Sequence, residues 1–340
     1  MPVLSDPSVE PGPNVIGTAT LFVAAMVGGS TLGLLAPSQA DSVADFTDAT
    51  LLALIFLLFF EIRLAAVARA FGNVRFLAIA WAANFLIVPT VGFAIASFLV
   101  SGQDLLFAGL MIYFLAPCTD WFLGFTRMAR GDTELGAALI PVNLISQLLL
   151  FPVWLWLFTP AMGFVDFAEM PVLLLQWFVI PMVLAQTLRL TLGKALSKAV
   201  FSALLDLSGR LTPAVLALLI LLIFASHVGD ILANAPVFGI VALGVVLFFA
   251  LTFLAGHALN SVAQLRYEEH TLLAMTMAAR NAPLMLALTA VAIPDQPLVL
   301  AVIVFGMLIE IPHLTLLRLL LLRRFHAIST SEARHVLRPQ

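Results

Sequence analysis

The chain has 340 residues, of which 62% are hydrophobic and 10% are charged, and its formal net charge is −3. Its mean hydropathy of +1.10 excludes a soluble globular domain, because such a domain cannot bury that much apolar surface. Each membrane-spanning helix needs about 20 apolar residues, so the chain is long enough for roughly ten spans with short loops. The absence of a GxxxxGK[ST] motif argues against direct coupling to ATP.

Residues 1–14 are acidic and rich in proline, and they lack the basic start of a signal peptide. The first apolar run is therefore predicted to remain in the protein as a membrane helix. Junctions rich in Ser, Pro and Asp separate it from nine further apolar runs. The ten predicted spans are Val15–Ala36, Ala49–Val67, Phe76–Val100, Leu105–Met128, Thr133–Phe158, Val172–Leu190, Leu211–Val228, Val237–Leu259, Thr271–Ile293 and Leu298–Leu321.

The basic residues predict the orientation of these spans. Every Lys and Arg except Arg280 lies at alternate junctions, and the junctions between them carry none. The positive-inside rule then places both termini in the cytoplasm, with ten crossings of the cell membrane. Residues 1–14 and 323–340 become short cytoplasmic tails, and the protein is predicted to be multi-pass.

The two halves of the chain are predicted to be inverted repeats. Five spans in each half, over residues 15–159 and 160–322, must enter the membrane from opposite sides. The apolar block Leu54–Phe60 resembles Leu218–Phe224, at a separation of roughly half the chain. Between the repeats, Gly193–Arg210 is either an amphipathic connector on the inner membrane face or an ordinary basic loop.

The fourth and ninth spans are interrupted by proline and polar residues at corresponding places in the two halves. The residues at these breaks are Pro117, Cys118, Thr119 and Asp120 in the fourth span and Arg280, Asn281 and Pro283 in the ninth. Proline removes a backbone donor, and broken helices are tolerated in a membrane only around a protein-lined cavity. The fold class is therefore an all-α membrane protein of ten transmembrane helices in two inverted five-helix repeats, with two crossed broken helices.

Polar residues at mid-membrane are the candidate site. Cys118 is either a substrate ligand or a small buried hydrophobe. Glu310 is either a proton carrier or a structural partner of Arg280. Asp120 either pairs with Arg280 or caps the second half of the fourth span, and Asn143 lies at similar depth in the fifth. The predicted substrate-binding residues are Cys118, Arg280, Asn281 and Asn143, and the predicted proton-coupling residues are Glu310 and Asp120.

These residues carry a resemblance to the bile-acid/sodium symporter superfamily and, within it, to the arsenite efflux permeases. The resemblance runs over nearly the whole membrane region. The segments that carry it are Ala116-Pro-Cys-Thr-Asp-Trp121, Ala129-Arg-Gly-Asp132, Pro141-Val-Asn143 with Gln147, Ala279-Arg-Asn281 and Leu308-Ile-Glu-Ile-Pro312.

The resemblance implies a core of spans three to five and eight to ten, and a panel of spans one, two, six and seven. Transport would proceed by rocking one domain against the other. In the arsenite permeases a cysteine and a glutamate are the functional pair and proton exchange drives efflux. The matching residues here are Cys118 and Glu310.

Two departures from the pattern bear on the substrate and the coupling ion. Pro117 stands where the arsenite permeases commonly have arginine before the cysteine. Sodium-coupled members hold sodium with acidic and amide groups of the ninth helix. Arg280 places a fixed positive charge at that break, which argues against a sodium ion there because like charges repel strongly in a low dielectric.

We therefore predict a secondary active transporter that exports arsenite or a related metalloid in exchange for protons, an antiporter that would confer arsenical resistance. The alternative is a sodium- or proton-coupled organic-anion carrier of the same superfamily, with Arg280 binding a carboxylate or sulfonate. The expected partners are a small-molecule substrate, protons and the lipid bilayer, without cofactor, metal or nucleic acid. No GxSxG or HExxH motif suggests an enzyme.

Overall fold

The computed structural model describes residues 15–62, 73–119, 121–158, 170–293 and 296–336, and these residues are almost entirely helical. In the first half of the chain the helices are α1 (Val15–Leu35), α2 (Pro37–Ala44), α3 (Thr47–Glu61), α5 (Val74–Ala82), η3 (Ala83–Ile87), α6 (Val88–Leu99), α7 (Asp104–Leu115), α8 (Trp121–Met128) and α9 (Thr133–Phe158). In the second half they are α10 (Met170–Leu174), η4 (Leu175–Val179), α11 (Ile180–Ala195), α12 (Lys198–Ala233), η5 (Ala235–Val237), α13 (Phe238–Ala263), α14 (Tyr267–Ala278), α15 (Ala282–Ala292) and α16 (Pro297–Val336).

Each predicted span overlaps with helical structure within the described residues, which leave out residues 63–67 of the second, and the fourth and ninth are each split into two half-helices. Seven stretches are individually long and apolar enough to cross a membrane, and α7 and α15 are shorter apolar helices. The seven stretches are Gly17–Leu35, Val74–Leu99, Thr133–Phe158, Pro171–Ala195, Lys198–Ala233, Ala235–Ala263 and Pro297–Phe325. The sequence therefore predicted a multi-pass helical membrane protein correctly.

Two of the long helices open into a π-helical turn just before a proline. The π turn η3 precedes Pro89, and η4 precedes Pro181. Proline has no N–H to donate, so the turn before it loses an α-helical hydrogen bond and widens. The turn in η3 includes Asn84, which is fully buried and contributes to the site described below.

The helices form two groups. In the first, α1 and α3 pack on α12, and α11 packs on α3. Gly29 and Gly33 of α1 let its backbone approach α12 closely, because a Cβ at either position would lie 2.3 Å from the carbonyl oxygen of Leu221 or Ala225. This Gly-x-x-x-Gly spacing is typical of tightly packed membrane helices.

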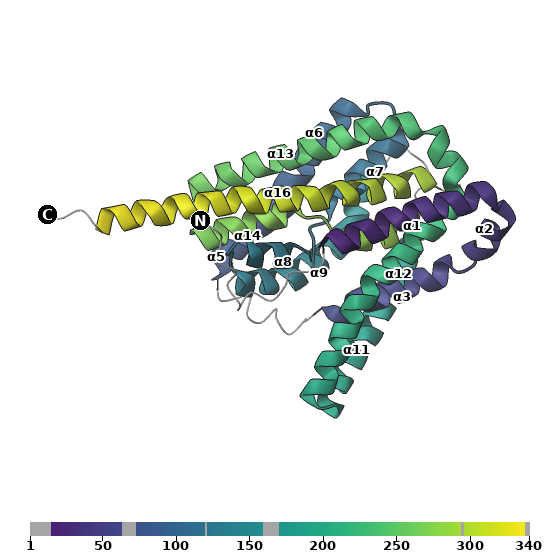
Figure 1. Cartoon of the computed structure of the whole chain (residues 1–340), viewed down its shortest axis with the longest axis horizontal. Helices are drawn as coiled ribbons and strands as arrows, with labels where there is room; N and C mark the ends of the chain where they lie inside the picture. The colour runs from purple at the N-terminus through teal and green to yellow at the C-terminus, as the bar shows by residue number, and fades with distance from the viewer. Residues whose placement is uncertain (1–14, 63–72, 120, 159–169, 294–295, 337–340) are drawn as a thin grey trace.

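The second group surrounds α7 and α16. The long helix α16 crosses the molecule beside α13 and α14, as Figure 1 shows. Gly109 of α7 and Gly306 of α16 lie at their contact, where a Cβ would come within 2.8 Å of the Val302 side chain and 3.0 Å of the Tyr113 ring, respectively. The close approach brings Tyr113 beside the carbonyl of Gly306.

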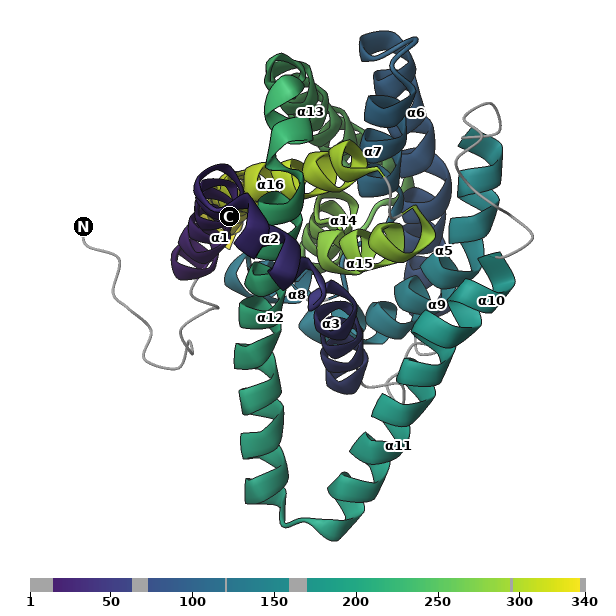
Figure 2. The same cartoon turned by 90° about the vertical axis from the view of Figure 1, so that its right-hand side faces the viewer.

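The predicted connector, which lies inside the second predicted repeat, differs from both alternatives considered above. Gly193–Arg210 is neither a separate connector helix nor a loop, because α11 ends at Ala195 and α12 begins at Lys198. The segment forms the tip of a helical hairpin, which extends beyond the other helices in Figure 2. The Ser197 hydroxyl caps α12 by accepting a hydrogen bond from the Val200 amide, so the sequence ends one helix and starts the next within two residues.

Candidate functional site

The two broken helices meet at their breaks. Pro117 and Arg280 form an isolated antiparallel bridge, the only such pairing among the residues that the structure describes. The Cys118 amide donates to the Ala279 carbonyl at 3.1 Å, and the Asn281 amide donates to the Ala116 carbonyl at 2.9 Å. These bonds satisfy backbone groups that the helix breaks would otherwise leave unpaired. We call residues 116–119 and 279–281 the crossing.

Arg280 neutralises the ends of the two half-helices that run into the crossing. Its fully buried guanidinium donates to the carbonyls of Phe114 at 3.0 Å, Thr276 at 2.7 Å and Met277 at 2.8 Å. These carbonyls belong to the last turns of α7 and α14, where the helix dipole is negative. The guanidinium carbon also lies 5.5 Å from the centre of the Phe248 ring. Backbone dipoles and an aromatic face therefore hold this charge.

Glu310 of α16 reaches the same place. Its Oε1 accepts a hydrogen bond from the Arg280 backbone amide at 3.0 Å, and its Oε2 accepts one from the Tyr113 hydroxyl at 3.0 Å. The same hydroxyl lies 3.0 Å from the Gly306 carbonyl. A hydroxyl has one proton to donate, so Tyr113 can serve only one of these acceptors at a time. A protonated Glu310 can donate to the tyrosine oxygen while the tyrosine donates to Gly306, so the network is satisfied in either protonation state.

Buried amides lie on the other side of Thr276. Asn84 and Asn143 both donate to the Thr276 hydroxyl, at 3.0 and 3.4 Å. The Oδ1 atoms of both residues and both polar atoms of buried Gln147 have no hydrogen-bond partner within the described part of the chain. Such oxygens could coordinate a hard cation or bind water. A cation here would face Arg280, which donates to the carbonyl of the same Thr276.

Asn281 is a helix cap as well as a member of the crossing. Its Oδ1 accepts a hydrogen bond from the Leu284 amide at 3.4 Å, which makes it the N-cap of α15. Its Nδ2 donates to the Thr119 hydroxyl at 3.1 Å and so ties the two breaks together through side chains. Asp120, which was predicted to couple protons and either to pair with Arg280 or to cap the second half of the fourth span, lies outside the described residues.

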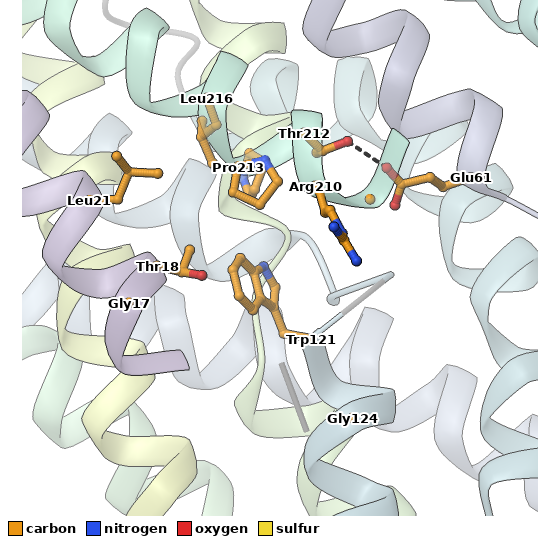
Figure 3. Close-up of a pocket in the computed structure, with 12 residues that line it drawn as sticks. Gly17, Thr18, Leu21, Glu61, Trp121, Gly124, Arg210, Thr212, Pro213 and Leu216 are labelled. Carbon is orange, nitrogen blue, oxygen red and sulfur yellow. Dashed lines mark hydrogen bonds between the residues drawn. The ribbon is translucent and has the colours of Figure 1, made fainter. Parts of the chain in front are cut away.

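A large cavity of about 700 Å³ lies between the two groups of helices. Figure 3 shows the Trp121 ring close to Thr18, Pro213 and Arg210 in this space. Glu61, at the end of α3, accepts hydrogen bonds from Thr212 at 2.5 Å and from Ser208 at 3.3 Å. The lining residues are Gly17, Thr18, Leu21, Glu61, Trp121, Gly124, Gly209, Arg210, Thr212, Pro213, Leu216 and Pro283.

Trp121 stands between this cavity and the crossing. It lines the large cavity and also a small one that touches Arg280 and Glu310. The small cavity has a volume of about 10 Å³, which is roughly the room for one water molecule. The side chain that separates the substrate-sized space from the buried charges is therefore the first residue of α8.

The structure brings together some of the predicted site residues and separates others. Cys118, Arg280 and Glu310 are all buried at or beside the crossing, and none of the three is among the residues that line the large cavity. Pro283 does line it. Cys118 is fully buried and belongs to the hydrophobic core. Within the described residues, no group of three or more His, Cys, Asp or Glu could hold a metal.

The sequence interpretation missed Tyr113 and the residues of the cavity. Tyr113 is one of only two tyrosines in the chain and lies one helical turn before Pro117, which was an available signal. Arg210 had been assigned only to the cytoplasmic side. Its place in a cavity depends on how α12 packs against α3 and faces α8, and the local sequence carries no signal for that arrangement.

A model of the sodium bile acid symporter family matches residues 49–235, which is more than half of the chain. The match includes α3 to α12 and therefore the first break with Cys118, and it ends before Arg280 and Glu310. No curated protein matched the sequence. The match is to the family as a whole, so the narrower relationship to arsenite permeases stays a prediction.

Proposed function

Because the chain belongs to the sodium bile acid symporter family, we propose that it is a secondary active carrier that moves a small organic anion across the membrane by alternating access. The observation that carries the proposal is the cavity of about 700 Å³ between two groups of helices. Its volume falls in the range of pockets that enclose metabolite- or drug-sized ligands. A cavity between two packed groups is also what rocking of one group against the other would open and close.

The lining of the cavity favours an amphipathic anion. Trp121 begins α8 and Pro283 lies at the start of α15, so the positive ends of both half-helices adjoin the space. Arg210 adds a cationic side chain, and Leu21 and Leu216 supply apolar surface. A carboxylate or sulfonate at the half-helix ends, with an apolar body against the leucines, would satisfy both kinds of surface.

The transport cycle would follow from the predicted repeats. Residues 15–159 and 160–322 would each cross the cell membrane five times, and both termini would lie in the cytoplasm. The group of α1, α3, α11 and α12 would move against the remaining helices. The cavity is lined by Glu61 and Arg210, which lie next to junctions with clustered basic residues. This placement supports a state that is open to the cytoplasm.

Protons are the coupling ion that the geometry favours. Glu310 and Tyr113 form a network that is satisfied with the carboxyl group either charged or neutral. Arg280 places a permanent charge next to the buried amides of Asn84 and Asn143, and this charge disfavours a sodium ion at that place. Proton exchange through Glu310 would therefore replace the sodium that gives the family its name.

Proton-linked arsenite export is the second candidate. The observation that favours it is the position of Cys118, a buried thiol in the first break whose amide bonds to the second break. Trivalent arsenic binds thiols, and a single thiol would permit release. The thiol lies outside the lining of the large cavity, so this function requires a conformational change that exposes Cys118.

The test is transport by the purified protein in proteoliposomes with an imposed pH gradient of either polarity. Labelled taurocholate serves as the organic anion and labelled arsenite as the metalloid. We expect gradient-driven movement of taurocholate that is unchanged in Cys118→Ser and weakened in Arg210→Gln. Arsenite movement that is lost in Cys118→Ser would establish the second candidate instead. A sodium gradient that drives transport while the pH gradient does not would overturn proton coupling.

A further inference from the structure

A groove of about 410 Å³ runs along the outer surface between α13 and α16. Val246 and Phe253 line it from α13, and Ile309 and Leu320 line it from α16. Val246 and Leu320 are 54% and 40% exposed, so the groove opens toward the surroundings of the helices rather than toward the crossing. In a membrane protein these surroundings are lipid chains, and an apolar groove of this kind accepts an acyl chain.

The groove ends at two basic side chains. His257 follows Phe253 by one helical turn and Arg324 follows Leu320 by one turn, so both lie on the faces that line the groove. The Arg324 guanidinium lies 3.0 Å from Nδ1 of His257. The ring of His270, from α14, is centred 5.9 Å from the ring of His257. Three helices thus bring three basic residues to one end of an apolar groove.

Arg324 creates a positive field at this end of the groove. Burial, together with the nearby basic groups of Arg324 and His257, lowers the pKa of His270 from its ordinary value to about 4. The adjacent acid Glu269 is engaged elsewhere, because it accepts hydrogen bonds from the Arg266 backbone amide at 3.1 Å and from Asn73 at 2.9 Å. An anion beside Arg324 would give its guanidinium a partner of opposite charge at this end of the groove.

We propose that the groove and its basic end form a binding site for an anionic phospholipid. One acyl chain would lie between α13 and α16, and the phosphate would accept hydrogen bonds from Arg324 and His257. Arg324 lies three residues beyond the predicted end of the tenth span, at the level of lipid headgroups, on the side predicted to be cytoplasmic. Basic pockets between membrane helices on that side bind anionic headgroups, whereas a zwitterionic lipid would bring a second cation next to Arg324.

Native mass spectrometry of the purified protein tests the proposal without any transport measurement. Phosphatidylglycerol and phosphatidylcholine of identical chains are titrated against the wild type. We expect tighter binding of phosphatidylglycerol, and in Arg324→Gln a loss of about fivefold in that affinity. Ala250→Phe fills the groove without changing charge and should weaken both lipids. Lys198→Gln removes an exposed cation at the hairpin tip and is the matched control.

Two outcomes would overturn the proposal. One is equal affinity of the wild type for the two lipids. The other is an Arg324→Gln variant that retains the phosphatidylglycerol preference of the Lys198→Gln control. Because the readout is lipid binding, failure of this proposal would leave the proposed transport function untouched, and loss of transport would not affect it.

Discussion

The crossing and the large cavity are built in opposite ways. At the crossing, Arg280 and Glu310 are buried and held by main-chain groups and by Tyr113. In the cavity, Arg210 is exposed and Glu61 is bonded to hydroxyls of a neighbouring helix. The crossing is packed almost without free volume, whereas the cavity has room for a whole ligand.

Under the proposed function, buried charge and open space serve separate tasks in this molecule. A charge that is fixed by backbone carbonyls cannot turn toward a substrate without leaving those carbonyls unpaired, which is costly in a membrane. Side chains at the edge of an open cavity can adjust at little cost. We therefore assign ion coupling and structural support to the crossing and substrate binding to the cavity, with Trp121 between them.

The largest expected effect is the loss of stability in Arg280→Ala. The substitution removes the donors to three buried carbonyls, so we expect a loss of about 3–5 kcal/mol in the free energy of unfolding. The measurement is the thermal unfolding midpoint in detergent. Arg210→Ala is the matched control from the cavity, and its midpoint should stay close to that of the wild type.

Arg280→Ala also tests whether the guanidinium occupies a site that suits a free cation. If it does, the carbonyls that lose their donors in this variant should bind a cation from solution. We expect NaCl to raise the unfolding midpoint of Arg280→Ala relative to choline chloride, and to leave the wild type unaffected. Equal stability of Arg280→Ala and Arg210→Ala would contradict the distinction between crossing and cavity.

The next effect is the loss of proton-driven transport in Glu310→Gln. Glutamine keeps the size of the side chain but cannot release a proton, so accumulation driven by a pH gradient should fall more than tenfold. Exchange of labelled for unlabelled substrate needs no net proton movement and should persist. The two rates are measured in the same proteoliposomes. Parallel loss of both rates would mean that Glu310 supports the fold or the substrate and does not carry the proton.

The sequence predicted the apolar parts of the helices and the two breaks, but not α2 or the full lengths of α12 and α16. Pro117 and Pro283 marked the breaks because each stands beside polar residues inside an apolar run, whereas Pro141 and Pro152 lie inside the continuous helix α9. Thr133–Phe158 was predicted residue for residue, because charged or polar junctions flank it. Local composition therefore determined where helices start, end and break.

The partners of the buried charge could not be predicted in the same way. Arg280 was expected to bind a carboxylate or a substrate, but its guanidinium donates to main-chain carbonyls. Every residue has such a carbonyl, so the sequence cannot indicate which ones accept these hydrogen bonds. The cavity depends on the packing of α12 against α3 and on the position of α8 at the opposite side of the space, and these helices are distant in sequence. The shape of a cavity is set by tertiary packing, and the pattern of apolar residues within one helix does not predict how helices pack.

A smaller effect is expected at the boundary between the two regions. Trp121→Ala would join the small cavity beside Glu310 to the large one, so water could reach the carboxyl group without the transport cycle. We expect a severalfold faster decay of a pH gradient across proteoliposomes in the absence of substrate. Trp121→Phe retains most of the ring and is the control. A decay rate equal to that of the wild type would place the barrier at another side chain.

The smallest effect should come from Arg210, because its exposure allows water and salt to screen the charge. Arg210→Gln should raise the KM for taurocholate by roughly threefold and leave the maximal rate unchanged, since a screened contact of this size contributes only modestly to binding. Raising the KCl concentration should increase the KM of the wild type toward that of the variant and change the variant little. If Arg210→Gln instead removed transport at every substrate concentration, Arg210 would act in the conformational cycle, and the cavity would share the coupling task that we assign to the crossing alone.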